Sequence, residues 1–181
     1  MDRISFGKAV NLGYSDLEDM EYIGKIGGYE VYRQDYDYGD YVGTAFDVID
    51  PNVVRGKRQP TYKRVMEIEL AQEYSKAWHV NISRVDKKYQ GQGLSFRIYR
   101  FLLSKIPGFV LQAGTSQSPG GAYIWYKLSQ FKDVLIYGRT KAGRPAMMIP
   151  NDELREMQCY NPSKDAYDSD KEFYMFAMKC A

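Results

Sequence analysis

The chain has 181 residues, enough for one domain with a buried core. Its net charge is +2, from 25 Lys and Arg against 23 Asp and Glu, so the overall charge gives no argument for nucleic-acid binding. No stretch approaches the ~20 apolar residues of a membrane span, and the first residues lack a secretory signal, so we expect a cytoplasmic protein. Cys159 and Cys180 fit no disulfide framework, and a single histidine, His79, excludes a His-rich metal site.

The first half of the chain is dominated by strand signals. One short helix is expected over residues 14–24, where a serine and a glutamate stand at capping-box spacing. Two alternating segments, 29–37 and 41–50, flank a Tyr-Gly-Asp turn, so residues 29–48 are predicted to form an antiparallel hairpin. The prolines and charges of residues 50–62 predict a loop.

Two further segments alternate strictly between apolar and polar residues, which is typical of half-buried strands. In residues 65–70 three apolar side chains share one face, and Glu67 and Glu69 share the other. In residues 77–85 the apolar set opposes a more polar set that includes His79.

The second half of the chain mixes helices and strands. Residues 94–106 repeat apolar side chains at helical spacing, and a Pro-Gly pair ends this helix. The other expected elements, in chain order, are strand 109–113, a Gly- and Ser-rich loop at 114–121, helix 122–131, strand 133–139 and a final strand at 173–180. This order predicts a mixed α/β sheet in one domain, 1–181, with a polar insertion at 139–171 that contains one turn of helix at 152–157.

The segment Val85–Ser95 is the most informative, because a strand ends, a glycine-rich turn follows and a helix begins at once. Backbone N–H groups of such a turn point the same way, and the helix dipole adds positive potential. Gly91 and Gly93 let a phosphate approach the backbone closely. The segment therefore predicts a site for a diphosphate-bearing ligand, with a glycine-rich turn that binds nothing as the alternative. The endings of a P-loop and of a dinucleotide fingerprint are absent.

From Val85 to Ser95 the sequence resembles motif A of the GNAT superfamily of N-acetyltransferases, with Gln90, Gly93 and Ser95 in the slots of Gln/Arg-x-x-Gly-x-Gly/Ala. The resemblance implies that the loop amides hold the pyrophosphate of acetyl-CoA and that the preceding strand pairs with the pantetheine arm. The cofactor-binding residues implied in this way are Ser83, Val85, Gln90, Gly91, Gln92, Gly93, Leu94 and Ser95.

A second match lies at Ile124–Phe131, which is similar to the family pattern Leu-Tyr-x-Lys-Leu-Gly-Phe. The Lys-Leu pair places Trp125 where the family often has a tyrosine acid, with Tyr126 beside it and Tyr123 one turn back. The resemblance implies an α/β (α+β) fold of GNAT type: a mixed, mostly antiparallel central sheet, splayed at the acyl-CoA site and flanked by helices.

The implied function is an acyl-CoA-dependent N-acyltransferase that acts by direct attack of an amine, without a metal. Attack needs a base for the amine, a donor for the thioester carbonyl and an acid for the thiolate. His79, Glu67 and Glu69 are the candidate bases, because the family often places its base on the strand before motif A or on its neighbour. Tyr126 and Tyr123 are the candidate acids. The acceptor, a small molecule, a protein or a nucleobase, stays open.

Two other functions compete with this interpretation. The first is a phage-type, DNA base-modifying transferase on the same fold, in which aromatic side chains stack a flipped base. Its phosphate contacts would come from basic side chains, namely Arg55, Lys57, Arg58, Arg97, Arg100 and Lys105. The second is a degenerate acyltransferase fold that serves as a binding or inhibitor protein, which the departures at Ser95, Trp125 and Ser129 favour.

Overall fold

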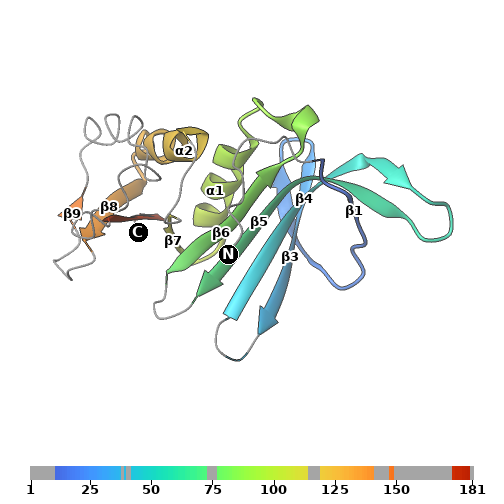
Figure 1. Cartoon of the computed structure of the whole chain (residues 1–181), viewed down its shortest axis with the longest axis horizontal. Helices are drawn as coiled ribbons and strands as arrows, with labels where there is room; N and C mark the ends of the chain where they lie inside the picture. Colours follow the sequence, from blue (N-terminus) through green and yellow to red (C-terminus); the bar gives the residue numbers. More distant parts are fainter. Residues whose placement is uncertain are drawn as a thin grey trace, which may run out of the picture. The chain divides into compact units, whose positions relative to one another are not determined.

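The computed structural model describes residues 11–37, 39, 42–72, 77–113, 119–140, 147–148 and 173–179. The chain divides into two compact units (Figure 1). Unit 1 comprises Met1–Glu73 and Asn81–Ile98, and unit 2 comprises Tyr74–Val80 and Tyr99–Ala181. Strand β6 and helix α1 therefore contribute residues to both units.

Unit 1 is built on an antiparallel sheet whose strands are long. Its strands are β1 (Tyr14–Ser15), β2 (Glu21–Ile26), β3 (Tyr29–Asp37), β4 (Val42–Arg55), β5 (Thr61–Gln72) and the larger part of β6 (Trp78–Val85). They lie in the order β2-β3-β4-β5-β6, and β1 pairs with β5. The 3₁₀ turn η1 (Lys87–Tyr89) then leads towards α1 (Leu94–Lys105).

The hairpin predicted at 29–48 is confirmed, because β3 and β4 pair in antiparallel register from Asp37–Val42 to Glu30–Ile49. The alternation predicted for 65–70 is also confirmed. The apolar side chains of β3, β4 and β5 on one face of the sheet are buried, together with Leu94 and Ile98 of α1. The core of unit 1 contains Val31, Phe46, Val48, Met66, Ile68, Leu70, Leu94 and Ile98.

The helix expected at 14–24 is wrong, because this segment forms β1 and the start of β2. Tyr14 and Ser15 pair with Lys63 and Tyr62 of β5, and Glu21–Ile26 pairs with β3. An isolated helix of this length is marginal in water, whereas β1 and β2 gain backbone pairing with β5 and β3. The capping-box spacing was therefore a weaker signal than the available sheet edge.

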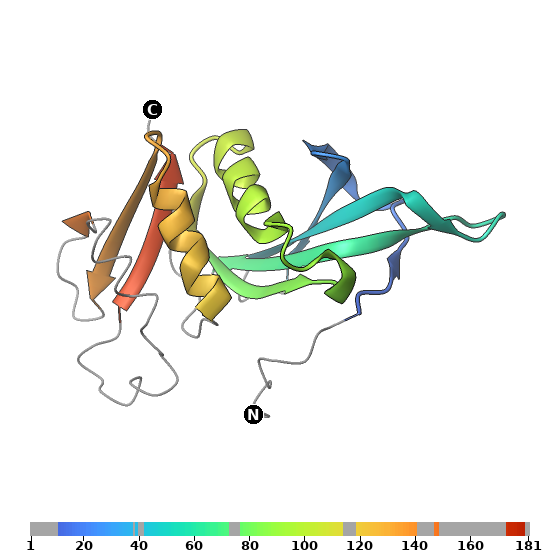
Figure 2. The same cartoon turned by 90° about the horizontal axis from the view of Figure 1, so that it is seen from above.

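The loop expected at 50–62 is also wrong, since most of it continues β4 and β5 as a two-stranded arm. Figure 2 shows this arm extending beyond the neighbouring strands of unit 1. Pro51 fits because the pairing of β4 with β5 shifts register between Asp50 and Val54. Gly56, with φ 80°, allows the turn at the tip.

Unit 2 has a smaller sheet, with strands β7 (Val110–Gln112), β8 (Val134–Thr140), β9 (Met147–Met148) and β10 (Phe173–Lys179) and the helix α2 (Pro119–Ser129). The order is β6-β7-β10-β8-β9, with β7 parallel to β6 at Trp78 and His79. β10 lies between β7 and β8 and is antiparallel to both. The final strand predicted at 173–180 therefore forms, and it lies inside the sheet.

The expected fold class, a GNAT-type α/β (α+β) sheet flanked by helices, is wrong. The described residues form ten strands but only two α-helices, of 12 and 11 residues, so this part of the chain is mostly β-sheet. Much of the difference comes from 14–24 and 50–62, which are largely strand. The turn expected at 152–157, like Cys159 and Cys180, lies outside the described residues. No helix in the described ranges is long and apolar enough to cross a membrane.

Candidate functional site: the turn between strand β6 and helix α1

The turn after β6 is anchored by a buried ion pair. The carboxylate of Asp86, only 1% exposed, accepts hydrogen bonds from Lys63 Nζ at 2.6 Å and from the backbone N–H of Leu12 at 3.1 Å. It also accepts from the N–H of Lys88 at 3.0 Å, which caps η1. Burial alone would raise the pKa of Asp86, but these hydrogen bonds and the charge of Lys63 hold it below its usual value. The start of the turn is therefore fixed to the body of unit 1.

Both glutamines of the turn point back to the protein. Gln90 Nε2 donates to the carbonyl of Val85 at 3.0 Å, and Gln92 Nε2 donates to the carbonyl of Lys88 at 3.4 Å. The hydroxyl of Tyr29 donates to Gln92 Oε1 at 3.3 Å. These side chains hold the shape of the turn, which leaves the backbone as the surface presented to a ligand.

Two glycines give the turn its open backbone. Gly91 has φ 77° and Gly93 has φ 71°, backbone angles that residues other than glycine rarely adopt. A Cβ atom built on either glycine would meet no atom within 4 Å. The carbonyl of Gly93 accepts from the N–H of Arg97 at 3.1 Å and so opens α1. Gly93 has no side chain to cap the helix, and the first N–H groups of a helix lack a carbonyl partner within it. This is the geometry of a backbone anion site.

The side chains around the turn are basic. Lys87, Lys88 and Arg97 are exposed, and residues 87–97 contain no acidic side chain. Arg97 Nη1 lies 3.7 Å from the position of a Cβ built on Gly27, so its guanidinium is beside the β2–β3 turn. The charges and the open backbone together suit a ligand with more than one phosphate.

The other predicted cofactor residues flank this turn. Ser83 is exposed on β6, and Val85 is half-buried with its carbonyl bound to Gln90. Leu94 is buried at 3% exposure and fixes the start of α1 in the core, whereas Ser95 is half-exposed. The structure thus brings the whole predicted loop together within unit 1.

A row of acidic side chains crosses the polar face of the sheet in unit 1. Tyr32 pairs in register with Asp47, and Asp47 pairs with Glu67, so the three side chains share one face. Asp47 is 4% exposed and accepts from the hydroxyl of Ser15 at 2.6 Å. Arg64 Nη1 lies 2.8 Å from Glu67 Oε1 and 3.4 Å from Asp47 Oδ1.

The two candidate glutamate bases differ in their surroundings. Both carboxylate oxygens of Glu67 lie near guanidinium groups, since Arg64 Nη1 is 2.8 Å from Oε1 and Arg84 Nη1 is 3.7 Å from Oε2. No hydrogen bond or ion pair joins the carboxylate of Glu69 to another described residue. Burial, and secondarily the charge of Glu67, raises the pKa of Glu69 above its usual value. Glu69 is therefore the better proton acceptor of the two.

The remaining catalytic candidates belong to unit 2. His79 is half-buried on β6 and lies in register with Gln112 of β7. On α2, Tyr123 is 43% exposed and its ring centroid lies 6.0 Å from that of Tyr126, while Trp125 is buried.

Several supports of the turn and the sheet face were missed by sequence reasoning. Asp47 stands in an alternating strand at a polar position, which was a usable signal. The ion pair between Lys63 and Asp86 joins residues 23 positions apart, and the hydrogen bond from Leu12 joins residues 74 positions apart. Neither pairing has a local sequence signature.

No group of three or more His, Cys, Asp or Glu side chains within the described ranges is arranged to hold a metal ion. No protein-family model, no curated protein and no solved structure matches the chain. The observations that bear on function are therefore the open glycine turn and the acidic row on the sheet.

Proposed function

We propose that the chain is an acyl-coenzyme A-dependent N-acyltransferase, and that the turn Gln90–Gly93 binds the pyrophosphate of the donor. The observation that carries this proposal is the pair of positive-φ glycines, with open space at both, immediately before α1. Backbone N–H groups of this kind bind phosphate without a metal ion. The resemblance of Gln90–Ser95 to motif A supports coenzyme A as the diphosphate ligand.

The proposed reaction is direct attack of an amine on the thioester carbonyl. The amine nitrogen forms a bond to the carbonyl carbon, the carbon–sulfur bond breaks, and the amide and free coenzyme A are released. The amine loses a proton to a base, for which Glu69 is favoured by its raised pKa, and the thiolate gains a proton from an acid. The N–H of Ser83 or Arg84 is the proposed donor to the carbonyl oxygen.

The proposal includes a cytoplasmic location, where acyl-CoA donors are available and reduced Cys159 and Cys180 would persist. Native mass spectrometry of freshly purified protein is expected to show bound coenzyme A or acyl-CoA. Incubation with acetyl-CoA and a panel of amines would then show turnover through the acetylated amine and free coenzyme A. Tight coenzyme A binding without transfer to any amine would favour a binding protein over an enzyme.

Gly93→Val is expected to weaken coenzyme A binding by tenfold or more, measured by calorimetry. The Cβ of the variant would occupy the open space in which the phosphate is proposed to lie, and φ 71° is unfavourable for valine. Gly108→Val is the matched control, because Gly108 also has positive φ (67°) with no atom within 4 Å and stands outside the turn. It should carry a similar strain and leave the affinity unchanged.

An unchanged affinity for coenzyme A in Gly93→Val would contradict the assignment of the pyrophosphate to this turn. Equal losses in Gly93→Val and Gly108→Val would also contradict it, because the effect would then follow from backbone strain in general.

A further inference from the structure

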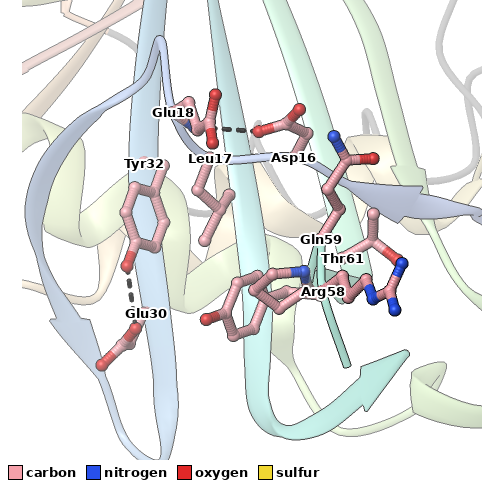
Figure 3. Close-up of a pocket in the computed structure, with 10 residues that line it drawn as sticks. Asp16, Leu17, Glu18, Glu30, Tyr32, Arg58, Gln59 and Thr61 are labelled. Atoms are coloured by element: carbon pink, nitrogen blue, oxygen red, sulfur yellow. Dashed lines mark hydrogen bonds between the residues drawn. The ribbon is translucent and has the colours of Figure 1, made fainter. Parts of the chain in front are cut away.

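A cavity in unit 1 lies outside the glycine turn. Its volume is about 510 Å³, within the range of small-molecule sites. Figure 3 shows side chains from the N-terminal segment, from β3 and from the tip of the β4–β5 arm around it. The residues that decide its chemistry are Asp16, Glu18, Glu30, Tyr32, Arg58 and Tyr62.

The lining of this pocket is more acidic than basic, with three carboxylates and one guanidinium. In Figure 3, Glu18, Glu30 and Tyr32 lie on one side, and Arg58 lies with Gln59 on the other. No ion pair joins Arg58 to these carboxylates. The acidic side can therefore accept a positive charge from a ligand.

The carboxylates of the pocket are unequally occupied. Glu30 accepts from the hydroxyl of Tyr32 at 3.0 Å and pairs with the exposed Lys25 at 3.1 Å. Asp16 Oδ1 accepts the backbone N–H of Glu18 at 3.0 Å, and the exposed carboxylates of Asp16 and Glu18 have no other hydrogen bond or ion pair with a described residue. Asp16 and Glu18 are thus the groups available to a cationic ligand.

Two tyrosine rings complete the pocket. Burial, followed by the hydrogen bond to Glu30, raises the pKa of Tyr32 to about 12, so its phenol stays protonated and its ring stays neutral. Neutral aromatic rings beside carboxylates suit an ammonium group on an apolar chain, because the ring faces attract cations and cover methylene groups.

We propose that this pocket binds a small primary aliphatic amine in its ammonium form. Asp16 and Glu18 receive the ammonium group, and the rings of Tyr32 and Tyr62 cover its methylene chain. Binding at this pocket does not depend on the N-acyltransferase function proposed above.

The test uses 1,4-diaminobutane as the probe and measures its binding by calorimetry at neutral pH, without coenzyme A. The unaltered protein should bind the probe, and sodium butyrate should not bind. The double variant Asp16→Asn/Glu18→Gln should lose about fivefold in affinity, the loss expected when two exposed charges are removed. Asp19→Asn is the matched control, because Asp19 lies on the same segment outside the pocket lining and should bind the probe normally.

Each outcome decides a separate point. Absence of probe binding in a protein that binds coenzyme A overturns the pocket assignment and leaves the proposed function standing. Probe binding that is weakened in the double variant supports the pocket, even where coenzyme A fails to bind and the proposed function falls. Equal affinities in the double variant and in Asp19→Asn overturn the assignment, provided that circular dichroism shows both variants to be folded.

Discussion

Glu69→Gln is expected to lower kcat/KM for amine acetylation by about 10²-fold or more, because it removes the proposed general base. The rate of the unaltered enzyme should fall as pH decreases through the pKa of Glu69. That pKa is raised by burial, so this acid limb should lie above the usual glutamate range. The acid limb should disappear in the variant. The measurement is the rate of acetyl transfer to 1,4-diaminobutane, or to the best acceptor of an amine panel, from pH 5 to pH 9.

Stability provides the control for this prediction. A raised folded-state pKa means that the folded protein binds more protons than the unfolded chain between the two pKa values, so stability is lost as pH rises through that window. Glu69→Gln lacks this loss. The variant should therefore be at least as stable as the unaltered protein at pH 7, and this advantage should vanish below the usual glutamate pKa.

Glu67→Gln provides the comparison. Glu67 is held by Arg64 and Arg84, so its replacement should lower the stability of the fold. The acid limb of the pH–rate profile should remain in this variant. Rates within about threefold of the unaltered enzyme in Glu69→Gln, with the acid limb intact, would show that Glu69 is not the base. His79→Ala, Tyr123→Phe and Tyr126→Phe are the variants to compare next.

The sequence predicted those elements in which one local pattern agreed with the tertiary environment. Strict alternation over 65–70 gave the buried face of β5 correctly, and helical spacing gave α1. Prediction failed at 14–24 and 50–62, where the deciding interaction is pairing with a distant strand. Capping boxes and prolines are local signals, and they carry no information about a free sheet edge.

The candidate site also has a part that was predictable from the sequence and a part that was not. The glycine turn was identifiable because Gly91 and Gly93 lie beside each other in a strand–turn–helix sequence, and both adopt positive φ. The groups that hold the turn were not identifiable, since Leu12, Lys63 and Asp86 come from separate elements. The same is true of the pocket, which joins Asp16 to Arg58 and Tyr62.

Lys63→Met is expected to lower the free energy of unfolding by about 3–5 kcal/mol, the range observed when one partner of a buried ion pair is removed. The side chain of Lys63 is 13% exposed and that of Asp86 2%, so the remaining carboxylate would be buried beside methionine with only backbone donors. The ammonium of Lys63 also donates to the carbonyl of Leu12, so the variant would lose one of the contacts that hold the N-terminal segment. Urea unfolding at pH 7, followed by circular dichroism, measures the change.

Lys25→Met is the matched control, because Lys25 forms an ion pair with Glu30 at 3.1 Å but its side chain is 59% exposed. Exposed pairs contribute little to stability, so this variant should unfold almost as the unaltered protein does.

The pH dependence gives a second test. In the unaltered protein the lowered pKa of Asp86 stabilises the fold above the usual aspartate pKa, and this contribution is lost as pH falls through the folded-state value. Without Lys63, burial should raise the pKa of Asp86 instead, and protonation would relieve the buried charge. The stability difference between Lys63→Met and the unaltered protein should therefore shrink from pH 7 towards pH 4. A loss no larger than that of Lys25→Met, or a difference independent of pH, would show that the buried pair does not hold the turn.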